Sequence, residues 1–210
     1  EWITGLSHDL KTPLSSILGY SAMLASKDYE WSKEEVQSFA ETMEEKAHYM
    51  DALIKELTYT YQLKNKAITL TKEQINVAQL LSGQQSPRVK VEVAHNTTVY
   101  ADELALKRIL NNLLSNSLQY TPEEKEVTVH VNETKTDTIF TISDQGTGIP
   151  QEKLDNLFER YYRGTNTTTD TSGTGLGIAI TKQLIDLHNG DISVKSNKDG
   201  TIFTIRLPKM

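Results

Sequence analysis

The stretch Ser7-His8-Asp9-Leu10-Lys11-Thr12-Pro13-Leu14 decides how the start of this chain is interpreted. At the helical period of about 100° per residue, the apolar positions around it form a stripe roughly 80° wide; they are Ile3, Leu6, Leu10, Leu14 and Ile17. His8 lies about 160° from the centre of that stripe, so we expect its imidazole to face solvent. Asp9 flanks His8, and Thr12 shares its side of the helix one turn later. Pro13 lacks the amide hydrogen that would bond to the Asp9 carbonyl, so we expect a bend there.

Outward from this stretch, apolar spacing predicts two helices that form a hairpin. The first covers residues 1 to about 26, and a polar break covers Lys27–Trp31. Ser32-Lys33-Glu34-Glu35 has the form of a capping box that opens a second helix ending near Lys64. Its apolar residues recur at helical spacing; they are Val36, Phe39, Met43, Met50, Leu53, Leu57 and Tyr61. A lone hairpin cannot cover this seam, so we expect a second copy to complete a four-helix bundle. The alternative is packing against the chain's own second domain.

After Asn65 the pattern changes to short alternating runs that predict strands among helices. Expected strands are Ile68–Leu70, Val89–Val93, Val127–Val131, Thr138–Ser143, Asp191–Lys195 and Thr201–Leu207, the last two as a hairpin. Expected helices are Val77–Leu81, Leu104–Leu118 and Gly175–Leu187. Strands that alternate with helices, with one sheet face covered, indicate a two-layer α/β sandwich. We therefore divide the chain into a helical domain of residues 1–65 and a sandwich domain of residues 66–210.

Four further blocks of the sandwich domain carry groups suited to a nucleotide. They are Asn112-Leu-Leu-Ser-Asn116, Asp144-Gln-Gly-Thr-Gly-Ile-Pro150, Leu157-Phe-Glu-Arg-Tyr-Tyr-Arg163 and Gly173-Thr-Gly-Leu-Gly177. The two asparagines lie one turn apart and offer amide oxygens, which are hard ligands for Mg²⁺. Asp144 can accept a hydrogen bond from the exocyclic amine of adenine. The last block precedes a helix, whose free amides favour phosphate, and it matches neither a Walker loop nor a Rossmann fingerprint.

With its five blocks in this order, the chain resembles the cytoplasmic kinase core of a two-component sensor histidine kinase. The resemblance implies a dimeric four-helix bundle followed by a two-layer α/β sandwich ATP-binding domain of the gyrase and histidine kinase type. It implies autophosphorylation of His8 from Mg²⁺-ATP and transfer of the phosphoryl group to an aspartate of a response regulator receiver domain. Dephosphorylation of that regulator is a further activity of the family.

The resemblance also assigns roles to individual residues. His8 is the nucleophile, Asp9 orients the imidazole and takes its proton, and Thr12 positions water for the phosphatase reaction. Asn116 is the metal ligand. The ATP-binding set is Asn112, Asn116, Gln119, Tyr120, Asp144, Gly146, Gly148, Ile149, Tyr161, Arg163, Gly173, Thr174, Gly175, Leu176 and Gly177. Gln119 stands where the family commonly has Lys or Arg, and Ser117 stands where alanine is common. The family also usually has more residues between Leu81 and Tyr100.

Composition narrows the class of protein further. The net charge of −6 and the lack of a basic stripe argue against nucleic-acid binding. There is no cysteine, so disulfides and thiolate metal sites are excluded. No apolar run approaches the roughly 18 residues of a membrane span. Since the chain opens inside a helix without a cap, we expect a fragment, the cytoplasmic portion of a protein anchored in the membrane through sensor segments that it lacks. The Thr/Asn/Ser-rich stretch Thr165–Ser172 is expected to be a mobile lid.

Two other classes of protein remain as alternatives. Gyrase-like and mismatch-repair-like ATPases share the nucleotide fold, but they use a glutamate base where this chain has Asn112, whose amide cannot deprotonate water. Those enzymes also offer no role for the His8 helix. A degenerate kinase that only dimerises and binds a regulator is the second alternative. Loss of His8, Asn116 or the glycines would favour it, and all are present.

Overall fold

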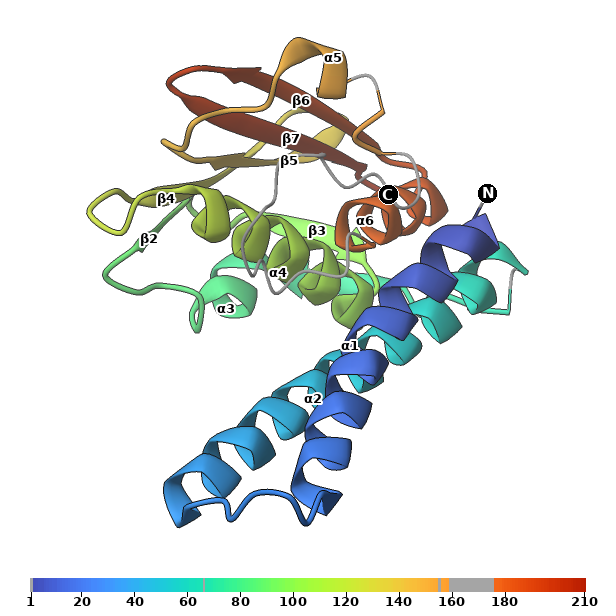
Figure 1. Cartoon of the computed structure of the whole chain (residues 1–210). Coiled ribbons are helices and arrows are strands. Elements are labelled where there is room, and N and C mark those ends of the chain that lie inside the picture. The colour runs from blue at the N-terminus through green and yellow to red at the C-terminus, as the bar shows by residue number, and fades with distance from the viewer. Residues whose placement is uncertain (1, 66, 155, 159–175) are drawn as a thin grey trace. The chain divides into compact units, whose positions relative to one another are not determined.

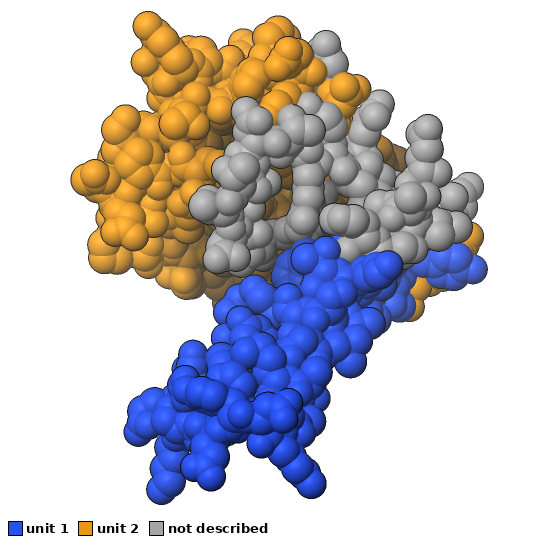
Figure 2. Space-filling model, viewed as in Figure 1, with its two compact units in different colours: residues 1–61, 172–174 blue, residues 62–171, 175–210 orange. Residues whose placement is uncertain are grey.

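The computed structural model describes residues 2–65, 67–154, 156–158 and 176–210, with the main chain alone at residues 2–8 and 64. The described residues fall into two compact units, one ending at Tyr61 and one starting at Gln62 (Figure 2). No described helix has the length and apolar character needed to cross a membrane. The helices and strands are labelled in Figure 1.

The first unit is a hairpin of two long helices, α1 (Trp2–Ala25) and α2 (Lys33–Lys64), as predicted. The expected capping box opens α2, because the Ser32 amide donates to Glu35 Oε2 at 2.9 Å and the Glu35 amide donates to Ser32 Oγ at 3.2 Å. The hydrogen bond from the Ser32 amide, followed by that from the Ser32 side chain, lowers the pKa of the Glu35 carboxyl. Pro13 lies inside α1, which continues through it.

The connection between the two helices is held by aromatic side chains. Trp31 packs against Tyr29 with ring centroids 4.5 Å apart and against Phe39 at 5.0 Å. The Trp31 indole donates to the Met23 carbonyl at 3.1 Å, and Tyr20 packs on Phe39 at 5.1 Å. The stretch Lys27–Trp31, interpreted above as a polar break, therefore contributes an aromatic cluster that fixes the closed end of the hairpin.

The second unit is built on a five-stranded sheet with the order β2-β4-β5-β7-β6. The strands are β2 (Val89–Val93), β4 (Val127–Glu133), β5 (Asp137–Ser143), β7 (Gly200–Pro208) and β6 (Asp191–Asn197). β2 and β4 are parallel, and the other neighbours are antiparallel. Alternate residues of β5 are buried, and helices cover that face of the sheet (Figure 1). The predicted two-layer sandwich is confirmed.

Within the described part of the second unit, two longer helices and two short ones accompany the sheet. They are α4 (Glu103–Tyr120), α6 (Gly177–Leu187), α3 (Val77–Leu81) and α5 (Gln151–Leu154). α4 and α6 contact each other, and their apolar faces supply much of the core, including Leu106, Ile109, Leu113, Ile180 and Leu184, all with no exposed surface. α4 is capped by Asp102, whose Oδ1 accepts from the Ala105 amide at 2.9 Å.

The strands between α2 and α4 differ from those predicted from the sequence. The strand expected at Ile68–Leu70 is absent, and the strand of this region is β1 (Glu73–Asn76). β1 pairs antiparallel with β3 (Thr98–Ala101), a strand that was not predicted from the sequence. Two apolar residues are too short a pattern to define a strand. Which residues of this region form a strand depends on pairing with β3, more than twenty residues later in the chain. Between Leu81 and Val89 the chain turns directly into β2, so α3 is followed by a short connection.

Candidate active site

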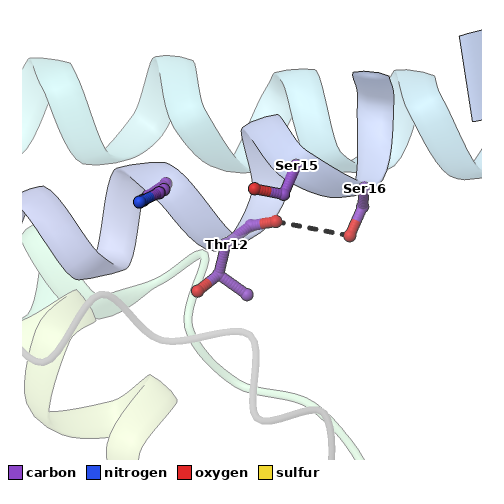
Figure 3. Close-up of a pocket in the computed structure, with 4 residues that line it drawn as sticks. Thr12, Ser15 and Ser16 are labelled. Atoms are coloured by element: carbon purple, nitrogen blue, oxygen red, sulfur yellow. Dashed lines mark hydrogen bonds between the residues drawn. The ribbon is translucent and has the colours of Figure 1, made fainter. Parts of the chain in front are cut away.

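Thr12 and its neighbours line an open hollow on the surface of α1 (Figure 3). The lining residues are Lys11, Thr12, Ser15 and Ser16. Ser16 Oγ donates to the Thr12 carbonyl at 3.3 Å, whereas the Thr12 side chain is exposed. His8 belongs to α1, but its side chain lies outside the described part, and Asp9 is half-buried. The described face thus offers the Thr12 hydroxyl about one turn from His8 along the helix, and the Ser15 and Ser16 hydroxyls about two turns away.

Asp144, directly after β5, is a buried carboxylate that two main-chain amides hold in place. Its Oδ1 accepts from the Gly146 amide at 2.9 Å and from the Thr201 amide at 3.0 Å. The Asp144 amide donates to the Thr201 carbonyl at 2.9 Å, so the residue extends the pairing of β5 with β7. Asp144 is 7% exposed, and no hydrogen bond from another described residue reaches its Oδ2. Of the two carboxylate oxygens, only Oδ1 is therefore engaged by described residues.

The glycine turn after Asp144 is close to other main-chain segments. A Cβ on Gly146 would overlap the Tyr120 carbonyl at the end of α4. Gly148 has a φ of 73°, and a Cβ there would overlap the Asn197 carbonyl. The Ile149 amide donates to Ser196 Oγ at 2.8 Å. Glycine is therefore required for both the backbone conformation and the close packing of this turn.

Asn112 and Asn116 have different surroundings on α4. Asn112 Nδ2 donates to the Gly177 carbonyl at 3.0 Å and lies 3.4 Å from Thr181 Oγ1, so it joins α4 to α6. Asn116 is half-buried, and no hydrogen bond joins its amide to another described residue. The described residues contain no cluster of three or more His, Asp or Glu side chains that would hold a metal ion. A metal ion here would need ligands from the nucleotide as well as the Asn116 oxygen.

The last turn of α4 carries the remaining described candidates of that helix. Gln119 is exposed and Tyr120 is 48% exposed. Ser117 is fully buried, and its Oγ lacks a hydrogen-bond partner among the described residues. A buried hydroxyl without a partner is destabilising, so Ser117 lowers the stability of this core.

The start of α6 leaves main-chain donors without a side-chain cap. Leu176 precedes the helix, is fully buried and makes no side-chain capping bond. Gly177 begins the helix and packs on Asn112. Free amides at a helix N-terminus favour an anion. The candidates Tyr161, Arg163, Gly173, Thr174 and Gly175, and the expected lid Thr165–Ser172, lie outside the described residues.

Sequence reasoning missed several residues that shape this site. Thr201 and Ser196 fix Asp144 and Ile149 through the bonds given above, from a hairpin about 50 residues later. Arg88 Nη2 donates to the Thr121 carbonyl at 2.9 Å and contacts the Leu118 carbonyl at 3.4 Å, at the C-terminus of α4. A cation is favourable at that end of a helix. No local pattern marks these residues, because each acts on a segment distant in sequence.

Two family models match the chain. The His Kinase A (phospho-acceptor) domain matches residues 1–65. The histidine kinase-, DNA gyrase B- and HSP90-like ATPase matches residues 101–210. The first match contains His8, and the second contains Asn116 and Asp144.

Individual proteins resemble the chain over its length. The sensor histidine kinase YvrG of Bacillus subtilis is 42% identical over 221 residues, which cover 100% of this chain and 38% of that protein. The solved histidine kinase AdeS of Acinetobacter baumannii has a TM-score of 0.72 at 22% identity, covering 96% of this chain and 97% of that one. Histidine kinase ThkA, solved in complex with response regulator protein TrrA, has a TM-score of 0.77 at 18% identity, covering 98% and 60%. The two structures establish a common fold.

Proposed function

This chain belongs to the sensor histidine kinase family of two-component signalling, and we propose that it autophosphorylates His8 from Mg²⁺-ATP and passes the phosphoryl group to an aspartate of a response regulator. The observation that carries the proposal is that one chain combines a phospho-acceptor match around His8 with an ATPase match around Asp144. The chain spans 38% of the length of YvrG. We propose the cytoplasmic portion of a membrane-anchored sensor, divided into domains of residues 1–65 and 66–210.

The proposed phosphoryl transfer begins with a neutral His8 imidazole. Its Nε2 lone pair forms a bond to the γ-phosphorus, the bond from that phosphorus to the bridging oxygen breaks, and ADP leaves. The Asp9 carboxylate accepts the proton that the imidazole loses. His8 and Asp9 are adjacent on α1, so the nucleophile and the proposed acceptor of its proton belong to the same helix.

The second unit supplies the proposed nucleotide site. Asp144 Oδ2 accepts from the adenine amine, while the Gly146 and Thr201 amides hold Oδ1 and fix the orientation of the carboxylate. The start of α6 receives phosphate through its uncapped amides. Asn116 fits Mg²⁺ by the chemistry of its amide oxygen, and the metal ion neutralises phosphate charge when bound.

We propose a homodimer as the functional form of the hairpin. Exposed apolar side chains are concentrated there, among them Leu14, Leu18 and Ile54 at 43%, 60% and 50% exposure. Burying such side chains in a four-helix bundle supplies a favourable free energy. The partner of the phosphotransfer step is a receiver domain, as the complex of ThkA with TrrA illustrates for a protein of this fold.

The competing function, ATP hydrolysis of the gyrase type, is disfavoured by Asn112. That position would need a carboxylate base, and an amide cannot take a proton from water. Here the Asn112 amide group donates to the Gly177 carbonyl and so serves to join α4 and α6. The observation supports a kinase whose nucleophile lies elsewhere in the chain.

The test is phosphohistidine formation by wild type, His8→Gln and Asp144→Asn with γ-labelled ATP and Mg²⁺. We expect acid-labile, base-stable phosphate in wild type and none in His8→Gln, which retains its ATP affinity because it lacks only the nucleophile. Asp144→Asn weakens ATP binding, since it replaces an acceptor oxygen by a donor. Acid-labile phosphate persisting in His8→Gln, or equal ATP affinity in Asp144→Asn, contradicts the proposed sites.

The proposed phosphatase activity has its own test in Thr12→Ala. The exposed Thr12 hydroxyl holds a water near the phosphorus without reacting itself, so its loss slows regulator dephosphorylation and largely spares autophosphorylation. Alanine is the better helix former, so α1 is retained. Ser15→Ala, from the same hollow, is the matched control. Equal loss of both activities, or unchanged dephosphorylation, contradicts this role.

A further inference from the structure

Asp102, the residue before α4, makes hydrogen bonds to three different segments of the second unit. Its Oδ1 accepts from the Ala105 amide at 2.9 Å and caps α4. Its Oδ2 accepts from the Thr71 amide at 2.8 Å. Its own amide donates to His188 Nε2 at 3.0 Å. One residue thus fixes the first turn of α4, the end of α6 and the segment that precedes β1.

Thr71 belongs to the segment that links the two helices of the hairpin to the sandwich. Residues 67–72 have no regular secondary structure, between the end of α2 at Lys64 and the start of β1 at Glu73. The Ala67 amide bonds locally to the Gln62 carbonyl. The Thr71 amide instead bonds to a residue 31 positions later. This bond therefore attaches the linking segment to the start of α4, two residues before β1 begins.

His188 makes the attachment point rigid. It is 2% exposed, and its Nδ1 lies 2.7 Å from the Leu184 carbonyl, so Nδ1 carries the proton and Nε2 accepts from Asp102. Burial lowers the pKa of His188, which favours this neutral form. At the start of α6, the Gly177 carbonyl is joined to Asn112 in the middle of α4. The two contacts therefore hold both ends of α6 against α4.

We propose that Asp102 is a positioning residue for autophosphorylation, and that it acts by holding the Thr71 amide and thereby the linking segment against the α4–α6 pair. The inference rests on the proposed function. α4 carries Asn116 and α6 begins at the proposed phosphate site, so the segment from the hairpin is attached to the helices that hold the nucleotide. A short, fixed attachment raises the effective concentration of the γ-phosphate at His8.

The test removes the bond from each side. Thr71→Pro deletes the donor, and Asp102→Asn keeps an oxygen for the Ala105 amide but offers Thr71 an amino group. Thr69→Pro is the control, because Thr69 is exposed and its amide has no hydrogen-bond partner among the described residues. We expect both variants to lower the autophosphorylation rate at saturating ATP about fivefold or more. We expect the ATP dissociation constant and the thermal midpoint to stay at the wild-type values, as in the control.

A variant that carries both substitutions shows whether Thr71 and Asp102 act through one shared hydrogen bond or cause two independent defects. If the two groups act through one bond, Thr71→Pro with Asp102→Asn is no slower than either single variant. Multiplied losses overturn the proposal, as does a wild-type rate in Thr71→Pro. A tighter or weaker ATP dissociation constant with an unchanged saturated rate also overturns it, because that pattern describes a local effect of the α4 cap on binding.

A spin-label measurement keeps the inference independent of the proposed function. The chain has no cysteine, so Glu41→Cys on α2 and Lys198→Cys between β6 and β7 give one label in each unit. We expect a broader distance distribution in Thr71→Pro than in Thr69→Pro or wild type. Equal distributions overturn the attachment. Absence of phosphohistidine in wild type overturns the proposed function, and the distance distributions still decide whether Thr71 is an attachment point.

Discussion

The two units of this chain differ in how far they bury their apolar side chains. Through Tyr61, the described hairpin fully buries one large apolar residue, Leu53, whereas the sandwich unit buries an extended core that includes Phe140, Phe203 and Leu113. Among residues whose side chains the structure describes, seven of the eleven exposed large apolar ones belong to the hairpin: Leu14, Leu18, Met23, Tyr29, Val36, Ile54 and Tyr61. The other four are Leu104, Tyr120, Ile202 and Met210. The described sandwich therefore encloses its core within one chain, whereas the described hairpin leaves much of its apolar surface exposed, which supports the proposed homodimer.

The largest expected effect tests whether the sandwich unfolds independently. Gly148→Ala forces a side chain into a φ of 73° and against the Asn197 carbonyl, which costs about 3 kcal/mol of unfolding free energy. Urea titration followed by circular dichroism should show the loss in the sandwich transition and an unchanged hairpin transition. Gly83→Ala is the control, since its Cβ meets nothing within 4 Å. Equal loss in both transitions would contradict independent units.

The next effect concerns the partner of the hairpin. Leu18→Glu places a charge on the exposed apolar face, where burial of leucine is worth about 2 kcal/mol per protomer. We expect the dimer dissociation constant from analytical ultracentrifugation to rise at least about tenfold. Leu104→Glu is the matched control, because Leu104 is 79% exposed on the other unit. An equal response of the two variants would place the dimer interface outside the hairpin.

A smaller effect concerns a buried hydroxyl group in the core of the sandwich. Ser117→Ala removes a buried hydroxyl that has no hydrogen-bond partner among the described residues. We expect the unfolding free energy to rise by about 1 kcal/mol in denaturant titration. Thr138→Val is the contrasting variant and should be destabilising, since the Thr138 hydroxyl donates to the Thr98 carbonyl at 2.8 Å. Destabilisation by Ser117→Ala would mean that the hydroxyl has a partner.

The smallest effect is a pH dependence confined to the sandwich. Burial, followed by the charge of Lys72, lowers the pKa of His188 from 6.5, while the Leu184 carbonyl and Asp102 oppose the shift. The unfolded chain therefore binds this proton at higher pH than the folded chain, so stability is complete above about pH 6.5 and falls as the pH drops below it. We expect His188→Gln to flatten this acid dependence in denaturant titrations at several pH values. An unchanged slope in the variant would show that His188 is not its source.

Local sequence signals predicted the elements of this fold more reliably than their long-range partners. The capping box of Ser32 and Glu35 depends on neighbours three residues apart, and it formed as expected. The helix Val77–Leu81 was predicted with the correct ends. β3 was missed and a strand at Ile68–Leu70 was wrongly expected, because strand pairing depends on a distant segment.

In the candidate site too, the motifs were visible in the sequence, whereas the contacts between distant residues were not. The turn at Asp144 and the glycines after it were visible as a motif, but the Thr201 amide that fixes the carboxylate lies 57 residues away. The link between Asn112 and Gly177 joins two motifs that the sequence shows separately. The roles of His8, Asp9 and Thr12 stay predictions, since the order of residues along a helix does not by itself reveal a reaction.

The aromatic cluster at the closed end of the hairpin has an optical consequence. The chain contains two tryptophans, Trp2 and Trp31, and both belong to the hairpin helices and their connection. Trp31 is enclosed by Tyr29 and Phe39, so its emission changes when that end opens. In a Trp2→Phe variant, Trp31 is the single tryptophan. The sandwich unit contains no tryptophan, so it does not contribute to tryptophan emission. Intrinsic fluorescence follows the hairpin alone, and any nucleotide-dependent change in it reports a signal that has travelled between the units.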